Sequence, residues 1–194
     1  LSAGQELARE AVQLWLCGLE EIPSGKIPHY AVDWQPEIFA FALVNLGLDE
    51  EAIKFTEAAL CLKPANEILM DLLIGLWQKQ GKMEAALDLV GVLASLNQNG
   101  ADRQRNLAKM LNMTGRWPEA YTTWKRTLHL TRTPLMDDWL GMAEASLEVN
   151  DLPQTIELCG KVLELDPNHG LANSMLGRAL VETGQYKEAI PVLV

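Results

Sequence analysis

The stretch that decides the fold is TGRWPEA at residues 114–120, because similar stretches recur before and after it at a fixed interval. QGKMEAA at 80–86 lies 34 residues earlier, and LGLDEEA at 46–52 lies a further 34 residues back. NDLPQT at 150–155 and GQYKEA at 184–189 continue the series downstream, at intervals of 35 and 34 residues. A constant period of this length is the sequence signature of a helical solenoid.

The period predicts an all-α protein, an α-solenoid in which each unit is a first helix, a tight turn and a second helix. First helices are predicted at 34–46, 67–80, 101–114, 135–149 and 169–183. Second helices are predicted at 50–62, 84–97, 118–131, 153–165 and 187–194. The array then occupies residues 33–194, in units near 33–66, 67–100, 101–135, 136–169 and 170–194.

Residues 1–32 are predicted to hold one more helix and a linker. Leu7, Ala11 and Trp15 recur at helical spacing, which predicts a helix over 3–21. Its sequence is similar to the second half of the later units, so we interpret it as a partial repeat whose first helix precedes the sequence given. The linker at 22–29 is bounded by two prolines.

Glycine, asparagine and proline punctuate the predicted helices. A left-handed residue is expected just after each first helix, at Gly47, Gly81, Gly115, Asn150 and Gly184. Pro118 and Pro153 fall at the opening of second helices, where the missing N–H costs nothing. The side chains predicted to cap first helices are Asn66, Thr133 and Asn168.

Small residues recur where the two helices of a unit would cross, at Ala40, Ala108, Ala143 and Gly177 in first helices and at Ala52, Ala86, Ala120 and Ala189 in second helices. Small side chains let two helices approach closely. In this pattern residues 33–194 resemble the tetratricopeptide repeat, with departures at Thr56, Ile74 and Thr155. The resemblance implies a right-handed superhelix whose first helices line a concave, partner-binding groove.

Composition narrows the classes of partner. The 194 residues include 26 acidic and 16 basic side chains, for a net charge of −10, which argues against binding to nucleic acid. No apolar run reaches the ~20 residues of a membrane span, so no membrane insertion is expected. Cys17, Cys61 and Cys159 are widely spaced and are interpreted as free thiols, which favours a reducing compartment. We expect a cytoplasmic protein, with the periplasm as the alternative.

The sequence has no pattern that is typical of an enzyme. His29, His129 and His169 lie far apart, and none has a second ligand at metal spacing. The Ser-Gly-Lys at 24–26 lacks the upstream glycine of a phosphate-binding loop. We therefore expect no catalysis, no metal and no cofactor.

The resemblance also assigns residues to the groove. From the first two units they are Trp34, Glu37, Ile38, Phe41, Asn45, Asp71, Leu72, Gly75, Gln78 and Lys79. From the last three they are Asp102, Arg105, Asn106, Lys109, Asn112, Asp137, Leu140, Gly141, Glu144, Glu148, Leu171, Ser174, Met175, Arg178 and Glu182.

An apolar stripe in this set comprises Trp34, Ile38 and Phe41, at i, i+4 and i+7 on a face that is polar elsewhere. The functional interpretation is a pocket for a hydrophobic anchor of a bound peptide. The structural interpretation is that the linker or a preceding helix covers the stripe. Both interpretations stay open at this point.

A basic cluster is the second feature, formed by Arg105, Asn106, Lys109 and Asn112 together with Lys79; Arg178 continues the positive charge in the last unit. Arg105 and Lys109 are like charges at i, i+4, which repel each other unless an anion answers them. The cluster could hold an acidic side chain or a terminal carboxylate of a partner. Alternatively Asp71 and Glu144 of neighbouring units neutralise it.

The function expected from these features is a non-enzymatic scaffold that binds a protein or peptide in its groove, with a partner that carries acidic groups and with self-association as a further option. Two alternatives stay open. The chain could be the substrate-recruiting or targeting module of a larger enzyme or regulator. It could also be a structural subunit of a secretion or pilus assembly.

Overall fold

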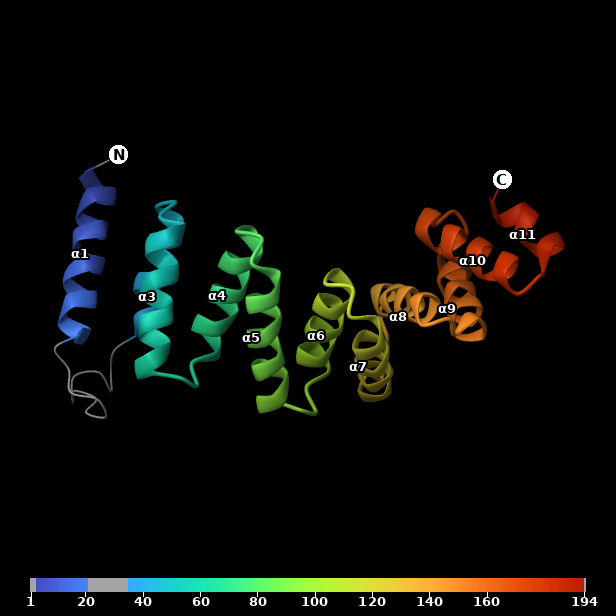
Figure 1. Ribbon diagram of the computed structural model, residues 1–194, viewed down its shortest axis with the longest axis horizontal. Coiled ribbons are helices and arrows are strands. Elements are labelled where there is room, and N and C mark those ends of the chain that lie inside the picture. Colours follow the sequence, from blue (N-terminus) through green and yellow to red (C-terminus); the bar gives the residue numbers. More distant parts are fainter. Residues whose placement is uncertain (1–2, 21–34, 194) are drawn as a thin grey trace. The chain divides into compact units, whose positions relative to one another are not determined.

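The computed structural model describes residues 3–20 and 35–193, and throughout these residues the chain is helical, with turns and no strand (Figure 1). The helices are α1 (Ala3–Glu20), α2 (Pro36–Asn45), α3 (Asp49–Leu62), α4 (Glu67–Lys79), α5 (Met83–Leu96), α6 (Ala101–Met113), α7 (Trp117–Leu130), α8 (Met136–Glu148), α9 (Leu152–Leu165), α10 (Gly170–Glu182) and α11 (Tyr186–Leu193). The all-α prediction is therefore confirmed, and each predicted helix is present.

The ends of the helices agree with the prediction to within one or two residues. The largest difference is at the start of α2, which begins at Pro36 rather than at residue 34. A residue before proline is disfavoured in the α region, and Gln35 accordingly has φ −110° and ψ 78°. Pro118 and Pro153 lie in the first turn of α7 and α9, as predicted.

A left-handed residue ends each first helix. φ is 72° at Gly47, 75° at Gly81, 72° at Gly115 and 78° at Gly184, and Asn150 has the matching value of 64°. The turn after α2 shows what this conformation achieves: the N–H groups of Gly47 and Leu48 donate to the carbonyls of Val44 and Leu43, at 2.9 and 3.0 Å. Two otherwise unpaired carbonyls of the helix end are satisfied in this way.

Two of the three predicted caps are wrong. Asn66 does cap α4, because its Oδ1 accepts the N–H of Leu69 at 3.2 Å. The residue before α8 is Leu135 rather than Thr133, and the side chain of Asp138 contributes to this cap by accepting a hydrogen bond from the Leu135 N–H at 3.0 Å. For α10 the capping residue is His169 rather than Asn168, with Nδ1 accepting the N–H of Ala172 at 3.3 Å.

The helices group into two compact units, residues 1–89 (unit 1) and 90–194 (unit 2), with the boundary inside α5. In unit 1, α1 packs on α3 through the fully buried Val12, and α3 lies between α1 and the α2–α4 pair. Phe55 is the centre of this core: its ring lies 4.5 Å from that of Trp15 and 4.8 Å from that of Phe39. Ala40 and Ala52 are fully buried, as the crossing of α2 and α3 requires.

In unit 2 the hairpins α6–α7, α8–α9 and α10–α11 pack in succession. Ala108, Ala120 and Ala143 are fully buried at the predicted crossings. Trp124 of α7 is also fully buried, and it fills the space over Gly141 of α8. A methyl group at Gly141 would lie 2.3 Å from Cζ2 of Trp124, so only glycine fits there.

Candidate functional site

The first-helix face of unit 1 is the exposed side of α2 and α4, where the sequence predicted an apolar stripe. Trp34 lies outside the described residues. Ile38 and Phe41 are exposed by 64% and 45%, although both side chains are large and apolar. The linker that was considered as their cover also lies outside the described residues.

A cavity of about 560 Å³, the apolar pocket, opens beside Phe41 on this face. Its apolar walls are Phe41 and Val44 from α2 and Ile68, Leu72 and Leu76 from α4. Gly75 of α4 lies in the wall with no side chain, and the space at its Cβ position is open. The pocket therefore brings together Phe41 with Leu72 and Gly75, which the resemblance placed in the groove; Ile38 is not in its lining.

The rim of the apolar pocket is polar. Asp71 and Lys79 of α4 and Asp49 of α3 contribute to it. The ammonium of Lys79 forms an ion pair with Oδ2 of Asp49, and Oδ1 of Asp49 is buried without a hydrogen bond to any described residue. Lys79 thus lies on the predicted face, but its charge is already balanced by a carboxylate of the same unit.

On the first-helix face of unit 2, formed by α6, α8 and α10, Arg105 is held inside the protein. Its guanidinium makes a two-pronged contact with Asp138, with Nε to Oδ1 at 2.6 Å and Nη2 to Oδ2 at 3.0 Å, and Nη1 pairs with Asp102. Asp138 is fully buried and Arg105 is 13% exposed. These hydrogen bonds to Asp138 raise the pKa of Arg105, against the opposing effect of its burial. The carboxylates that pair with Arg105 are thus Asp138 and Asp102, whereas Glu144, one of the two predicted internal partners, accepts a hydrogen bond from Asn112 of the same cluster.

Asn112 is also part of the packing of unit 2. Its Nδ2 donates to the carbonyl of Gly141 at 2.8 Å and to Oε2 of Glu144 at 2.9 Å, and its Oδ1 accepts from Nε1 of Trp124 at 3.2 Å. The side chain joins α6, α7 and α8 and is only 9% exposed. A side chain with both ends of its amide engaged has little left to offer a ligand.

The remaining basic residues of this face also have carboxylate partners. Lys109 lies 3.6 Å from Asp137, and Arg178 contacts Glu148 at 2.8 Å and Glu182 at 2.9 Å. Asn106 is exposed on α6. Lys79 belongs to unit 1 and is described there. On this face, therefore, acidic residues of the chain itself form ion pairs with Arg105, Lys109 and Arg178. That these basic residues bind a partner stays a prediction.

Within the described residues no group of three or more His, Cys, Asp or Glu side chains could hold a metal ion. Cys17 and Cys61 are exposed thiols, whereas burial raises the pKa of the Cys159 thiol to about 11 and keeps it protonated at neutral pH. None of the described helices is both long and apolar enough to cross a bilayer.

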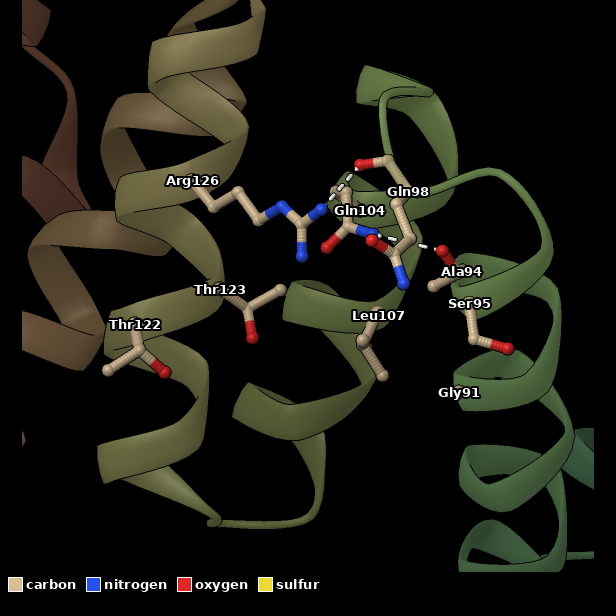
Figure 2. A pocket seen from close by; sticks show the side chains of 9 residues that line it. All are labelled: Gly91, Ala94, Ser95, Gln98, Gln104, Leu107, Thr122, Thr123 and Arg126. Carbon is tan, nitrogen blue, oxygen red and sulfur yellow. Dashed lines mark hydrogen bonds between the residues drawn. The ribbon is translucent and has the colours of Figure 1, made fainter.

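A second cavity, the polar pocket, lies in unit 2 and has a volume of about 390 Å³ (Figure 2). Arg126 and Thr123 of α7, Gln104 and Leu107 of α6, and Gln98 of the turn after α5 contribute to its wall. Sequence analysis missed this pocket, because its lining comes from three helices and one turn and shares no period. The signal that the sequence offers for this pocket is Arg126, a basic residue in a second helix.

The family model described as "Tetratricopeptide repeat" matches residues 146–194, about a quarter of the chain. No curated protein sequence matches this chain. Among solved structures, YrrB, described as "a TPR protein with an unusual peptide-binding site", has a TM-score of 0.71 at 17% identity, over 81% of this chain and 81% of its own. A MamA protein has a TM-score of 0.69 at 18% identity, over 79% and 84% of the two chains. MamA from Desulfovibrio magneticus RS-1 gives 0.69 at 14% identity, over 87% and 93%. At these identities the similarity shows the fold.

Proposed function

We propose that this chain, whose residues 146–194 match the tetratricopeptide repeat and whose fold is similar to that of YrrB and MamA, is a protein-interaction module, and that the apolar pocket of unit 1 receives a bulky apolar side chain of a peptide or protein partner. The repeats themselves do no chemistry in this proposal. They present a surface that is ordered before the partner arrives, so binding loses little conformational entropy on this side of the complex.

The observation that carries the proposal is the open apolar cavity on the first-helix face. A volume of about 560 Å³ is within the size range of ligand pockets. Phe41 and Ile68, at its wall, are 45% and 51% exposed, and Ile38, which lies one helical turn before Phe41 on α2, is 64% exposed. Large apolar side chains gathered in one place on a surface are typical of interaction sites. A bound apolar side chain would remove this surface from water.

The polar rim would orient a bound partner. Lys79 and Asp49 are already paired, and Asp71 adds a carboxylate to the same rim. A partner is therefore expected to place its apolar anchor in the cavity and its polar main chain along the rim. An acidic partner is not required, because the cations on both first-helix faces have carboxylate neighbours in the chain itself.

The test fills the pocket without harming the fold. Gly75 lies within helix α4 with no atom within 4 Å of its Cβ position, so Gly75→Leu projects a side chain into the cavity. Removing a glycine from a helix interior also stabilises the helix, by roughly 0.5–1 kcal/mol. Gly160→Leu on α9 is the matched control, because it makes the same exchange at another open helical position outside the pocket.

Peptides selected on the parent protein from a displayed random library are the probe. We expect them to share a bulky apolar residue and to lose affinity for Gly75→Leu by on the order of thirtyfold, the loss typical of a buried anchor. Gly160→Leu should bind them as the parent does. Selected peptides that bind Gly75→Leu and the parent equally would exclude the apolar pocket as the site.

A further inference from the structure

The polar pocket lies on the side of unit 2 that is opposite to its first-helix face. On α6, Arg105 and Lys109 lie on the first-helix face, where they meet Asp138 and Asp137 of α8. Gln104 and Leu107 line the polar pocket instead. With about 100° between successive residues of a helix, these two pairs lie on opposite sides of α6. The pocket is therefore a separate feature and not an extension of the predicted groove.

Arg126 distinguishes this pocket from the first-helix face. Nη2 of Arg126 donates to the main-chain carbonyl of Gln98 at 2.8 Å, and no carboxylate among the described residues lies within ion-pair distance of its guanidinium. Arg105 and Arg178 each contact two carboxylates. This hydrogen bond to Gln98 fixes one edge of the Arg126 guanidinium and leaves further N–H donors available for an anion.

Gln104 is a buried polar side chain that faces the same pocket. It is 4% exposed, and its Nε2 donates to the carbonyl of Ala94 at 3.1 Å. This bond directs Nε2 toward α5 and leaves Oε1 as an acceptor, with no hydrogen bond to it among the residues described. Figure 2 shows Arg126 reaching from α7 toward Gln98 and Gln104. A donor for anions and a fixed acceptor for an N–H group thus lie in one cavity.

The other walls limit what fits. Gly91 and Ala94 of α5 and Leu107 of α6 form an apolar part with room for a small side chain. The hydroxyl group of Thr123 donates to the carbonyl of Glu119 at 2.7 Å, so it can offer the pocket only an acceptor. A carboxylate, an adjacent N–H group and a small apolar side chain are the combination found at the end of a peptide or at an acidic residue within one.

We infer that the polar pocket is a second binding site, specific for a peptide carboxylate. The carboxylate pairs with Arg126, the neighbouring peptide N–H donates to Oε1 of Gln104, and a small side chain rests on Ala94 and Leu107. Arginine and carboxylate form charge-assisted hydrogen bonds, frequently two in parallel, that are stronger than hydrogen bonds between neutral groups. All these residues belong to unit 2, so the site stands apart from the apolar pocket and does not depend on the proposed function.

Three small probes test the site and identify the source of the carboxylate. They are N-acetyl-Gly-Ala with a free C-terminus, the same dipeptide with a C-terminal amide, and N-acetyl-Asp-Ala amide, each titrated into ¹⁵N-labelled protein. We expect saturable shifts of the Gln104 side-chain amide and of Arg126 Nε, with a Kd on the order of 1 mM. Binding of the free acid indicates a chain terminus, and binding of the aspartyl amide indicates an acidic side chain. No shift with either acid, or equal shifts with the uncharged amide, overturns the inference.

Variants then separate the guanidinium from the rest of the surface. Arg126→Gln should weaken the bound probe by about tenfold or more, the loss typical of a hydrogen bond to a charged group. Arg132→Gln, just beyond the end of α7, removes the same charge outside the pocket and should have no effect. Gly91→Leu fills the cavity at an open position and should abolish binding, whereas Gly160→Leu should not. Equal binding by Arg126→Gln and Arg132→Gln, or tighter binding of inorganic phosphate than of either acid probe, also overturns the inference.

Discussion

The two first-helix faces of this protein have the same position in the repeat but opposite character. In unit 1 the face opens into an apolar cavity beside the exposed Phe41. In unit 2 the face is a set of internal contacts, in which Asp138 holds Arg105 and the amide of Asn112 joins three helices. A position in the repeat therefore does not by itself make a residue available to a partner. A residue at such a position is available only where the neighbouring helix does not already supply a group that pairs with its side chain.

The largest effect should come from breaking the ion pair in unit 2. Arg105→Met leaves the fully buried carboxylate of Asp138 without its cation, which should cost about 3 kcal/mol of unfolding free energy. Lys79→Met in unit 1 removes a cation that is 67% exposed and should change stability by less than about 0.5 kcal/mol. Denaturant unfolding of the two variants measures the contrast, and equal losses would show that the faces do not differ in this way.

The next largest effect on stability is expected from substitutions at two glycines of first helices. Gly141→Ala places a methyl group against Trp124, which is buried and hydrogen-bonded and cannot move aside, so we expect a loss of about 2 kcal/mol. Gly75→Ala in the apolar pocket meets no atom and should gain roughly 0.5–1 kcal/mol from helix propensity. The signs of the two changes in Tm are the readout. A gain at both positions would mean that Trp124 does not press on α8.

A smaller effect is expected from two fully buried threonines. Oγ1 of Thr56 in unit 1 has no hydrogen bond to a described residue, so Thr56→Val should stabilise the protein by about 1 kcal/mol. Oγ1 of Thr127 in unit 2 donates to the carbonyl of Thr123 at 2.9 Å, and Thr127→Val should give no such gain. Thermal unfolding of both variants checks the difference, and a loss at Thr56 would contradict it.

The smallest perturbation is chemical labelling, which leaves the sequence unchanged. Cys17 and Cys61 in unit 1 are exposed, whereas Cys159 in unit 2 is buried with its pKa raised to about 11. At pH 8 the Cys159 thiol is therefore almost entirely protonated, and its reactive thiolate is both scarce and shielded. We expect a thiol reagent to modify two cysteines quickly and the third only as unit 2 opens. Three equally fast reactions would show that Cys159 is accessible.

The fold could be predicted from the sequence because its rules are local and repeated. Gly47, Gly81, Gly115, Asn150 and Gly184 mark turns whose geometry demands a left-handed residue, and they set the helix ends. Caps were harder to predict. Several polar residues compete just before a helix, and the choice of His169 over Asn168 depends on which one lies at the boundary itself.

The candidate sites were predictable only in part. Of the apolar stripe, Phe41 lines the cavity and Ile38 does not, and the cavity owes as much to the missing side chain at Gly75 as to Phe41. For Arg105, carboxylates in more than one neighbouring helix lie at suitable spacing, and only packing selects Asp138. Arg126 and Gln104 lie on different helices without a common pattern, so their convergence requires three-dimensional information.

The shared backbone angles at the five hairpin turns have an evolutionary consequence. Since φ falls between 64° and 78° at every one of them, the chain leaves each first helix along nearly the same path. A hairpin copied by gene duplication, or exchanged by recombination, meets a junction whose geometry it already fits. An array with such junctions can thus be lengthened, shortened or reshuffled while new surface chemistry is tried one hairpin at a time.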